Sequence, residues 1–193
     1  MNPADPERLP PSLYLLAVLA PEPVRGAVWA LKQEVHQRTG SRNAVRLPPH
    51  ITLLPPFRLL PAAFEPRARP LLARFAASHP AFEVGLRDFA WFGQRTLFVQ
   101  VTDSAPLRIL HAALQDLCRR QLPEVPLEKR PFTPHLTLAT RDLPGHLVPA
   151  LQREFAGRRF QAAFEVRQLT LFRHDGQRWQ EIEHFALGAG AAE

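Results

Sequence analysis

The short motif Pro-His-apolar-Thr-Leu occurs twice in the chain, and this repetition constrains the fold more than any other feature. The first copy covers residues 49–53 and the second covers residues 134–138, 85 residues later. Because successive side chains of a β-strand point to opposite faces, the histidine and threonine of each copy share one face and the apolar residues share the other. If the two halves of the chain pack about a pseudo-twofold axis, both polar faces would line one groove. The candidate site residues are His50, Thr52, His135 and Thr137.

The segments around the motifs predict an α+β fold, because each half reads strand, helix, motif strand, helix and hairpin. Besides the motif strands, of which the first is expected to end at Pro55-Pro56, strands are expected at residues 13–20, 82–86, 97–101, 164–172 and 178–187. Helices are expected around residues 24–39, 64–75, 107–117 and 147–155. We therefore expect residues 1–193 to form a single duplicated domain of two pseudo-symmetric lobes. The sheets are expected to be largely antiparallel, and the ends at residues 1–11 and 188–193 are expected to be loose.

Composition narrows the class of protein. Hydrophobic residues make up 46% of the chain and charged residues 22%, which is ordinary for a soluble globular protein. The net charge is +6, and nearly all of the positively charged residues are arginines, which is compatible with an anionic partner. The single cysteine, Cys118, cannot form an internal disulfide, and the apolar run at residues 13–20 is too short to span a bilayer. We expect a cytoplasmic protein with no membrane partner; its oligomeric state is left open, with a monomer expected.

Two histidines and two threonines on one groove suit phosphodiester chemistry. Imidazoles with a pKa near ~6.5 can share the roles of general base and general acid, and the threonine hydroxyls can donate hydrogen bonds to phosphate oxygens. The chain contains no His-Glu-x-x-His motif and no cysteine cluster, so no metal and no other cofactor is expected. A single His-x-Thr in a strand would favour a structural histidine bonded to the backbone. Its repetition, once per half, favours function.

These motifs give the chain a resemblance to a known family. With His50-Ile51-Thr52-Leu53, His135-Leu136-Thr137-Leu138 and the preceding run 130–134, it resembles the 2H phosphoesterase superfamily. Within it, the chain is similar over nearly its whole length to the 2′-5′ RNA ligase-like proteins, or RNA 2′,3′-cyclic phosphodiesterases. The resemblance implies a bilobal fold in which two mostly antiparallel sheets surround a central groove, with helices on the outside. It also implies hydrolysis of a 2′,3′-cyclic phosphate to a 2′-phosphate, with 2′-5′ ligation as the reverse reaction.

The resemblance further implies that His50 is the proton donor and that His135 accepts a proton from water. The residues alone do not distinguish the two roles, because the motifs are equivalent. Arg130 is a candidate to hold a phosphate, and a solvated loop position beside Glu128 is the alternative. Phe132 is a candidate to stack a nucleobase, and core packing is its alternative.

Three functions remain open from the sequence. The first is a metal-independent phosphodiesterase whose partner is an RNA with a 2′,3′-cyclic phosphate end or a small cyclic nucleotide. The second keeps the site but uses a small metabolite, such as an ADP-ribose cyclic phosphate. The third is an RNA-end or nucleotide-binding module with weak catalysis. Preference for oligonucleotides over mononucleotides would separate the first two, and binding without turnover would favour the third.

Overall fold

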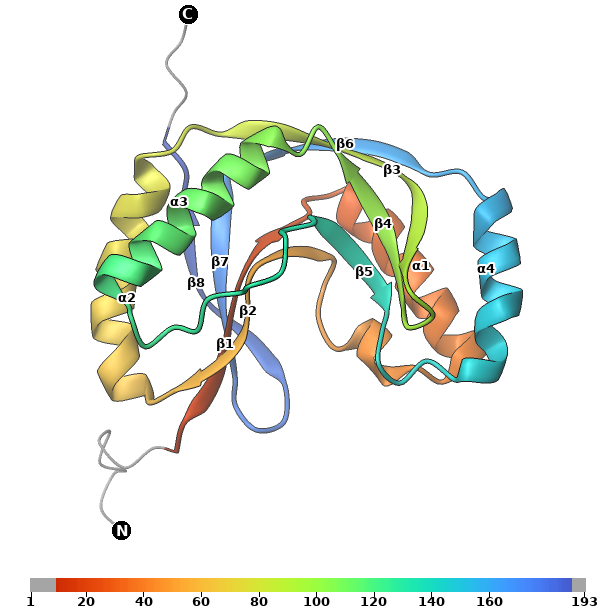
Figure 1. Ribbon diagram of the computed structural model, residues 1–193, viewed down its shortest axis with the longest axis horizontal. Coiled ribbons are helices and arrows are strands. Elements are labelled where there is room, and N and C mark those ends of the chain that lie inside the picture. Colours follow the sequence, from red (N-terminus) through yellow and green to blue (C-terminus); the bar gives the residue numbers. More distant parts are fainter. Residues whose placement is uncertain (1–9, 189–193) are drawn as a thin grey trace, which may run out of the picture.

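The computed structural model describes residues 10–188, so the expectations for the chain ends lie almost wholly outside the described part. The strands are β1 (Ser12–Leu19), β2 (His50–Leu59), β3 (Phe82–Phe92), β4 (Thr96–Thr102), β5 (His135–Ala139), β6 (Gln161–Val166), β7 (Gln168–His174) and β8 (Trp179–Ala186). The helices are α1 (Val24–Thr39), α2 (Pro61–Ala77), α3 (Ala105–Gln121) and α4 (Val148–Gly157), with short 3₁₀ helices at Arg42–Val45 and Gly145–Leu147. The expected α+β class is confirmed (Figure 1).

One curled sheet is found in place of the two sheets that the family resemblance implied. The strand order is β6-β3-β4-β5-β2-β1-β7-β8, and all neighbours are antiparallel. The sheet is continuous because the two motif strands pair with each other, through a single register pair between Ile51 and Leu136. Each half of the sheet therefore begins at a motif strand and extends outward from this seam.

The two halves of the sheet are not the two halves of the chain. Strand β1 lies in one half, but the helix that follows it, α1, packs on β5 and β6 of the other half. Helix α4 packs on β3 in that same half, whereas α2 packs on β8, and Figure 1 shows α3 beside α2. The prediction of one continuous strand at residues 164–172 is wrong, because the chain passes here from one half of the sheet to the other. The chain leaves β6, which pairs with β3, and enters β7, which pairs with β1.

Strand β2 runs past the two prolines that were expected to end it. The register between β1 and β2 is irregular between Leu16↔Leu54 and Tyr14↔Phe57, so Pro55 and Pro56 face no registered partner. Beyond Ile51, β2 also has no registered partner on its β5 side. Proline lacks a backbone donor and is tolerated at such irregular and edge positions.

Most buried apolar side chains form one core between the sheet and the helices. Ile51, Leu53, Leu136 and Leu138, the apolar residues of the motifs, all belong to it and are at most 1% exposed. A smaller cluster of Leu15, Ala17 and Phe172 lies apart from this core. None of the helices within residues 10–188 is both long and apolar enough to cross a membrane.

Candidate active site

The seam of the sheet brings the two motifs side by side. Because Ile51 lies opposite Leu136 in an antiparallel pair, His50 falls beside Thr137 and Thr52 falls beside His135. Ile51 and Leu136 both point into the core, so the four polar side chains share the opposite face. Each of the four is half-buried. The shared polar face is thus present, although each threonine neighbours the histidine of the other motif.

Both imidazoles are held in the same way. His50 Nδ1 donates a hydrogen bond to the carbonyl oxygen of Pro48, and His135 Nδ1 donates one to that of Thr133, each over 2.7 Å. A carbonyl oxygen can only accept, so Nδ1 carries a hydrogen in both rings and Nε2 is the nitrogen that gains or loses a proton. The repeated prolines, Pro49 and Pro134, explain the likeness. A residue before proline is restricted to extended conformations, which aims its carbonyl in the same direction both times.

Burial and nearby charge make the two histidines unequal. Burial lowers the pKa of His50 to about 4, with further lowering by the positive charge of Lys32 and by His135, while the bond to Pro48 opposes the shift. Burial also lowers the pKa of His135, against the effect of its bond to Thr133. Both imidazoles are therefore mainly neutral at pH 7 in the free protein. Each then presents an unprotonated Nε2.

Lys32 is a buried cation beneath the seam. It lies on α1, is 2% exposed, and its Nζ donates a 3.2 Å hydrogen bond to the carbonyl oxygen of Thr137. Burial lowers its pKa to about 8, so it remains mostly charged at neutral pH. No carboxylate of the described residues forms an ion pair with it. The sequence carried a signal for this residue, because Lys32 occupies an apolar-stripe position of α1, four residues after Val28.

Aromatic side chains flank both histidines. Phe92 contacts the His135 ring edge-on with a centroid distance of 4.9 Å, and Phe98 lies 5.1 Å from the same ring. The two phenylalanines stack on each other at 4.3 Å, and Phe92 remains 40% exposed. On the other side, Phe172 lies 6.4 Å from the ring of His50. Sequence reasoning missed these rings, because only the strand register places them on the motif face.

The two accessory candidates contact groups other than the paired histidines. The side chain of Arg130 is 84% exposed, and its hydrogen bonds go to Glu128 rather than to either motif. Phe132 stacks on His111 of α3, with centroids 3.9 Å apart and planes at 4°, so one ring face is covered. The structure therefore does not bring either residue into contact with the paired histidines. Their roles in binding phosphate and base remain predictions.

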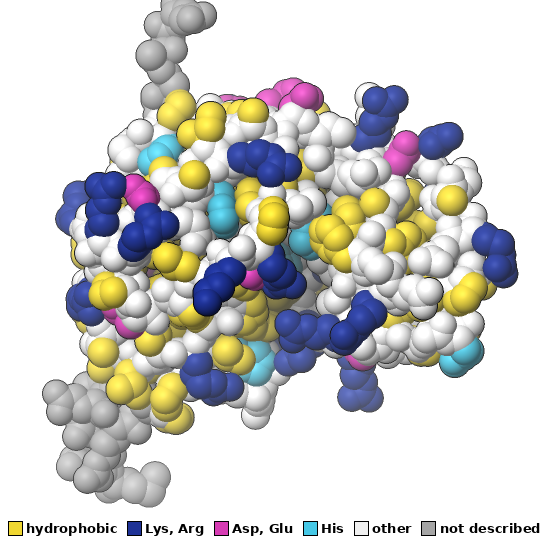
Figure 2. Space-filling model, viewed as in Figure 1, with side chains coloured by type: hydrophobic (Ala, Val, Ile, Leu, Met, Phe, Trp, Pro, Cys, Tyr) yellow, Lys and Arg dark blue, Asp and Glu magenta, His cyan; other side chains and the backbone are white. Residues whose placement is uncertain are grey.

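The space-filling view shows a hollow near the middle of the molecule (Figure 2). Histidine side chains are visible in it, and lysine and arginine side chains surround it, with few acidic ones (Figure 2). Within residues 10–188, no group of three or more histidine, cysteine or acidic side chains is arranged to hold a metal ion. Two imidazoles and two hydroxyls on one face of the sheet, with the buried ammonium group of Lys32 beneath it, are suited to an anionic ligand.

Comparisons with solved structures find the same architecture in other proteins. The structure of TT0787 from Thermus thermophilus has 25% sequence identity and a TM-score of 0.67, over 92% of this chain and 98% of that one. Escherichia coli LigT complexed with 3′-AMP has 19% identity and a TM-score of 0.64, again over 92% of this chain and 98% of that one. LigT complexed with NADP+ has 20% identity and a TM-score of 0.60, over the same shares. The LigT structures share the fold and bind nucleotides.

A family model places the chain among known sequences. No curated protein matches the sequence significantly. The model of the 2′-5′ RNA ligase superfamily, however, matches residues 21–178, which include both motifs. With this match over residues 21–178, the chain belongs to the 2′-5′ RNA ligase superfamily of the 2H phosphoesterases.

Proposed function

We propose that the protein is a phosphodiesterase that hydrolyses the 2′,3′-cyclic phosphate of an RNA end or a nucleotide to a 2′-phosphate, without needing a metal ion. The observation that carries this proposal is the pairing of Ile51 with Leu136, which sets two histidines and two threonines on one face at the seam. Both imidazoles present Nε2 as the nitrogen that exchanges protons. Membership of the 2′-5′ RNA ligase superfamily supports the same chemistry.

The reaction uses each motif once. His135 Nε2 takes a proton from water as the water oxygen attacks phosphorus. The bond from phosphorus to the 3′ oxygen breaks, and His50 Nε2 delivers a proton to that oxygen, leaving a 2′-phosphate. The hydroxyls of Thr52 and Thr137 donate hydrogen bonds to the non-bridging oxygens as their charge grows. The same sequence, with an RNA 5′-hydroxyl in place of water as the nucleophile, forms a 2′-5′ linkage and releases the 3′ oxygen as a hydroxyl.

Charge at the seam supports binding of an anion before reaction. The ammonium group of Lys32 is buried with no ion-pair partner among the described residues, and its positive potential favours a phosphate on the motif face. A bound phosphate monoanion in turn raises the pKa of both imidazoles, because an opposite charge nearby favours the protonated form. Substrate binding thus helps His50 take up the proton that it donates.

The decisive experiment uses a short RNA that ends in a 2′,3′-cyclic phosphate, incubated with the protein in EDTA. Wild type should yield the 2′-phosphate isomer, and His50→Ala and His135→Ala should each lose on the order of 10²-fold or more in rate. His146→Ala, an exposed histidine outside the motifs, serves as the control. Binding without turnover in the wild type would favour the nucleotide-binding module instead. Turnover of only a small cyclic phosphate would favour the metabolite substrate.

A further inference from the structure

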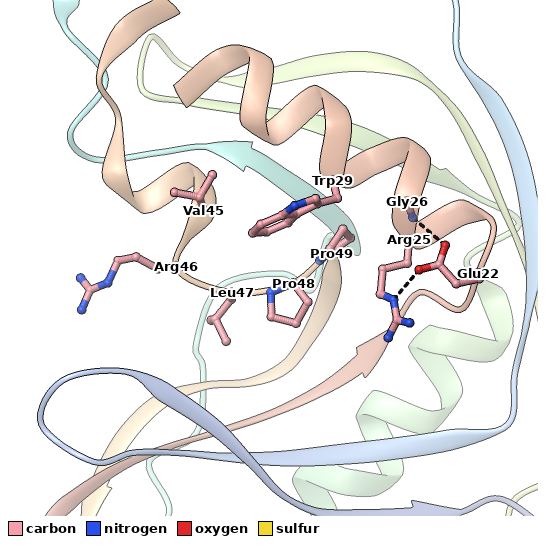
Figure 3. A pocket seen from close by; sticks show the side chains of 9 residues that line it. All are labelled: Glu22, Arg25, Gly26, Trp29, Val45, Arg46, Leu47, Pro48 and Pro49. Carbon is pink, nitrogen blue, oxygen red and sulfur yellow. Dashed lines mark hydrogen bonds and ion pairs between the residues drawn. The ribbon is translucent and has the colours of Figure 1, made fainter. Parts of the chain in front are cut away.

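A pocket of about 410 Å³ adjoins the His50 side of the candidate site. It lies between the beginning of α1 and the segment 45–49 that leads into β2 (Figure 3). None of the four motif histidines and threonines lines it. Its volume falls in the range of roughly 300–1,000 Å³ that small-molecule sites occupy.

The pocket and the motif face share structural elements. Pro48 lines the pocket, and its carbonyl oxygen accepts the hydrogen bond from His50 Nδ1. Leu47, the next lining residue, packs against the cluster that contains Phe172, whose ring lies beside His50. Pro48 precedes His50 by two residues, which an extended chain spans in about 7 Å. This separation is short enough for one extended ligand to reach both the motif face and the pocket.

The lining combines an aromatic ring with two guanidinium groups. Trp29 of α1 is half-buried and faces the segment 45–49, with Arg25 and Arg46 on opposite sides of it (Figure 3). The one acidic lining residue, Glu22, is already paired, because it accepts from Arg25 Nε and from the backbone nitrogen of Gly26 over 3.0 Å each.

Arginine charge at the pocket remains available to a ligand. Arg25 uses only Nε toward Glu22, which leaves its terminal nitrogens for other acceptors. Arg46 is exposed, and its contact is a 3.5 Å approach to Nε2 of His174 rather than to a carboxylate of the described residues. An indole ring between guanidinium groups matches a flat base flanked by phosphates, since aromatic rings stack bases and arginine forks bind phosphate.

We propose that this pocket binds the nucleotide next to the cyclic-phosphate end of an RNA, with its base against Trp29 and its phosphates near Arg25 and Arg46. This inference rests on the proposed function and specifies its substrate as an oligonucleotide. The remaining lining is largely valine, leucine and proline side chains, which cannot read the edge of a base. Base recognition at this position is therefore tolerant of sequence.

The first test is the dependence of the rate on the length of the RNA substrate. Rates are compared for a 2′,3′-cyclic mononucleotide and for a di- or trinucleotide with the same terminal residue. Wild type should show a higher kcat/KM on the longer substrates. Trp29→Ala should lower kcat/KM on them by about 5- to 150-fold, the value of one base stack, and leave kcat/KM on the mononucleotide unchanged. Trp29→Leu, which keeps apolar volume but removes the ring, should behave in the same way and guards against a folding defect.

Charge is the second test. Arg46→Gln and Arg25→Gln should lower kcat/KM only on the longer substrates and flatten its dependence on salt, because each removes a phosphate contact. Arg119→Gln is the matched control, since Arg119, like Arg25, pairs with a carboxylate three residues earlier in the chain. It should change neither property.

Several outcomes would overturn the proposal that the pocket binds a nucleotide. Equal wild-type rates on both lengths would do so, as would an equal loss on both lengths in Trp29→Ala. If wild type turns over neither substrate, the proposed function fails first, and equilibrium binding of the same trinucleotide then tests the pocket alone. Weaker binding in Trp29→Ala would support the pocket even then, whereas unchanged binding would overturn it.

Discussion

Lys32 Nζ donates a 3.2 Å hydrogen bond to the carbonyl oxygen of Thr137, a residue that lies 105 positions later in the chain. This contact ties α1 to the second motif strand, and the ammonium group also lies close enough to His50 to lower its pKa. A buried cation with no ion-pair partner in the described part of the chain is costly to folding. Because Lys32 lies beneath the paired motifs, we infer that its positive charge serves the site at the expense of folding stability.

We expect Lys32→Met to be more stable than wild type at neutral pH. The pKa of Lys32 is about 8 in the folded protein and 10.5 as its ordinary value, so the cost of burying its charge is present in full below pH 8. That cost is relieved as the pH rises from 8 to 10.5, by up to about 3 kcal/mol. Urea unfolding at pH 7 and pH 10 measures the effect. From pH 7 to pH 10, the free energy of unfolding of wild type should rise relative to that of the variant. A constant difference between the two proteins would contradict a lowered pKa for Lys32.

The pH profile of kcat/KM should be a bell whose maximum lies below pH 6.5. This ratio reports the free enzyme, in which the active form carries one protonated and one neutral histidine. Both pKa values are lowered from 6.5, that of His50 to about 4, so the active form is most abundant between them. The lower of the two pKa values sets the acid limb and the higher sets the alkaline limb, whichever histidine donates the proton.

Lys32→Met should move the acid limb of that bell to higher pH. Removing the cation removes one cause of the low pKa of His50, while burial still lowers it. The alkaline limb, which follows His135, should move less, because Lys32 is not among the causes of its shift. A merely structural role for Lys32 would scale the whole bell without moving its limbs.

His50 should also destabilise the folded protein in acid. Its pKa is about 4 when folded and 6.5 as its ordinary value, so above pH 6.5 it is neutral in both states and contributes no pH dependence. As the pH falls from 6.5 to 4, the unfolded chain binds the proton first, and folding loses up to about 3 kcal/mol. His50→Asn keeps a donor near the carbonyl of Pro48 and should lose less stability over this interval. His146→Asn, at an exposed position, should lose as much as wild type.

The sequence predicted the parts of the site that depend on local geometry. The alternation within each motif correctly separated the polar face from the core face, because a strand has a period of two wherever it lies. It also indicated the helices through their apolar stripes, including the end of α1 at Gly40, whose φ of 72° suits glycine.

What the sequence did not predict depends on contacts between distant segments. The continuous sheet rests on one pair, Ile51 with Leu136, and no local pattern specifies it. The covering of Phe132 depends on where α3 places His111, and the position of Phe92 beside His135 depends on the registers among β3, β4 and β5. Lys32 could have been recognised from its place in an apolar stripe.

Glu65 should be an important carboxylate for the half of the sheet that contains β1 and β7. It lies on α2 and accepts hydrogen bonds from Tyr14 Oη, Arg69 Nη2 and Arg173 Nη1, each over 2.8 Å. Glu65→Gln removes the negative charge that both arginines face. Its amide group, which is itself a donor, also replaces one of the two oxygens that accept from Tyr14, Arg69 and Arg173. We expect a loss of about 1–3 kcal/mol in the free energy of unfolding.

The control for Glu65 is Asp116, which also contacts two arginines but on the surface of α3. Exposed ion pairs contribute little, so Asp116→Asn should change stability by less than about 1 kcal/mol. Urea unfolding at pH 7 compares the two variants. Equal effects would show that Glu65 acts as an ordinary surface charge. A larger loss for Glu65→Gln, with unchanged rates on the cyclic mononucleotide, would show that the residue holds α2 against the sheet without entering the chemistry.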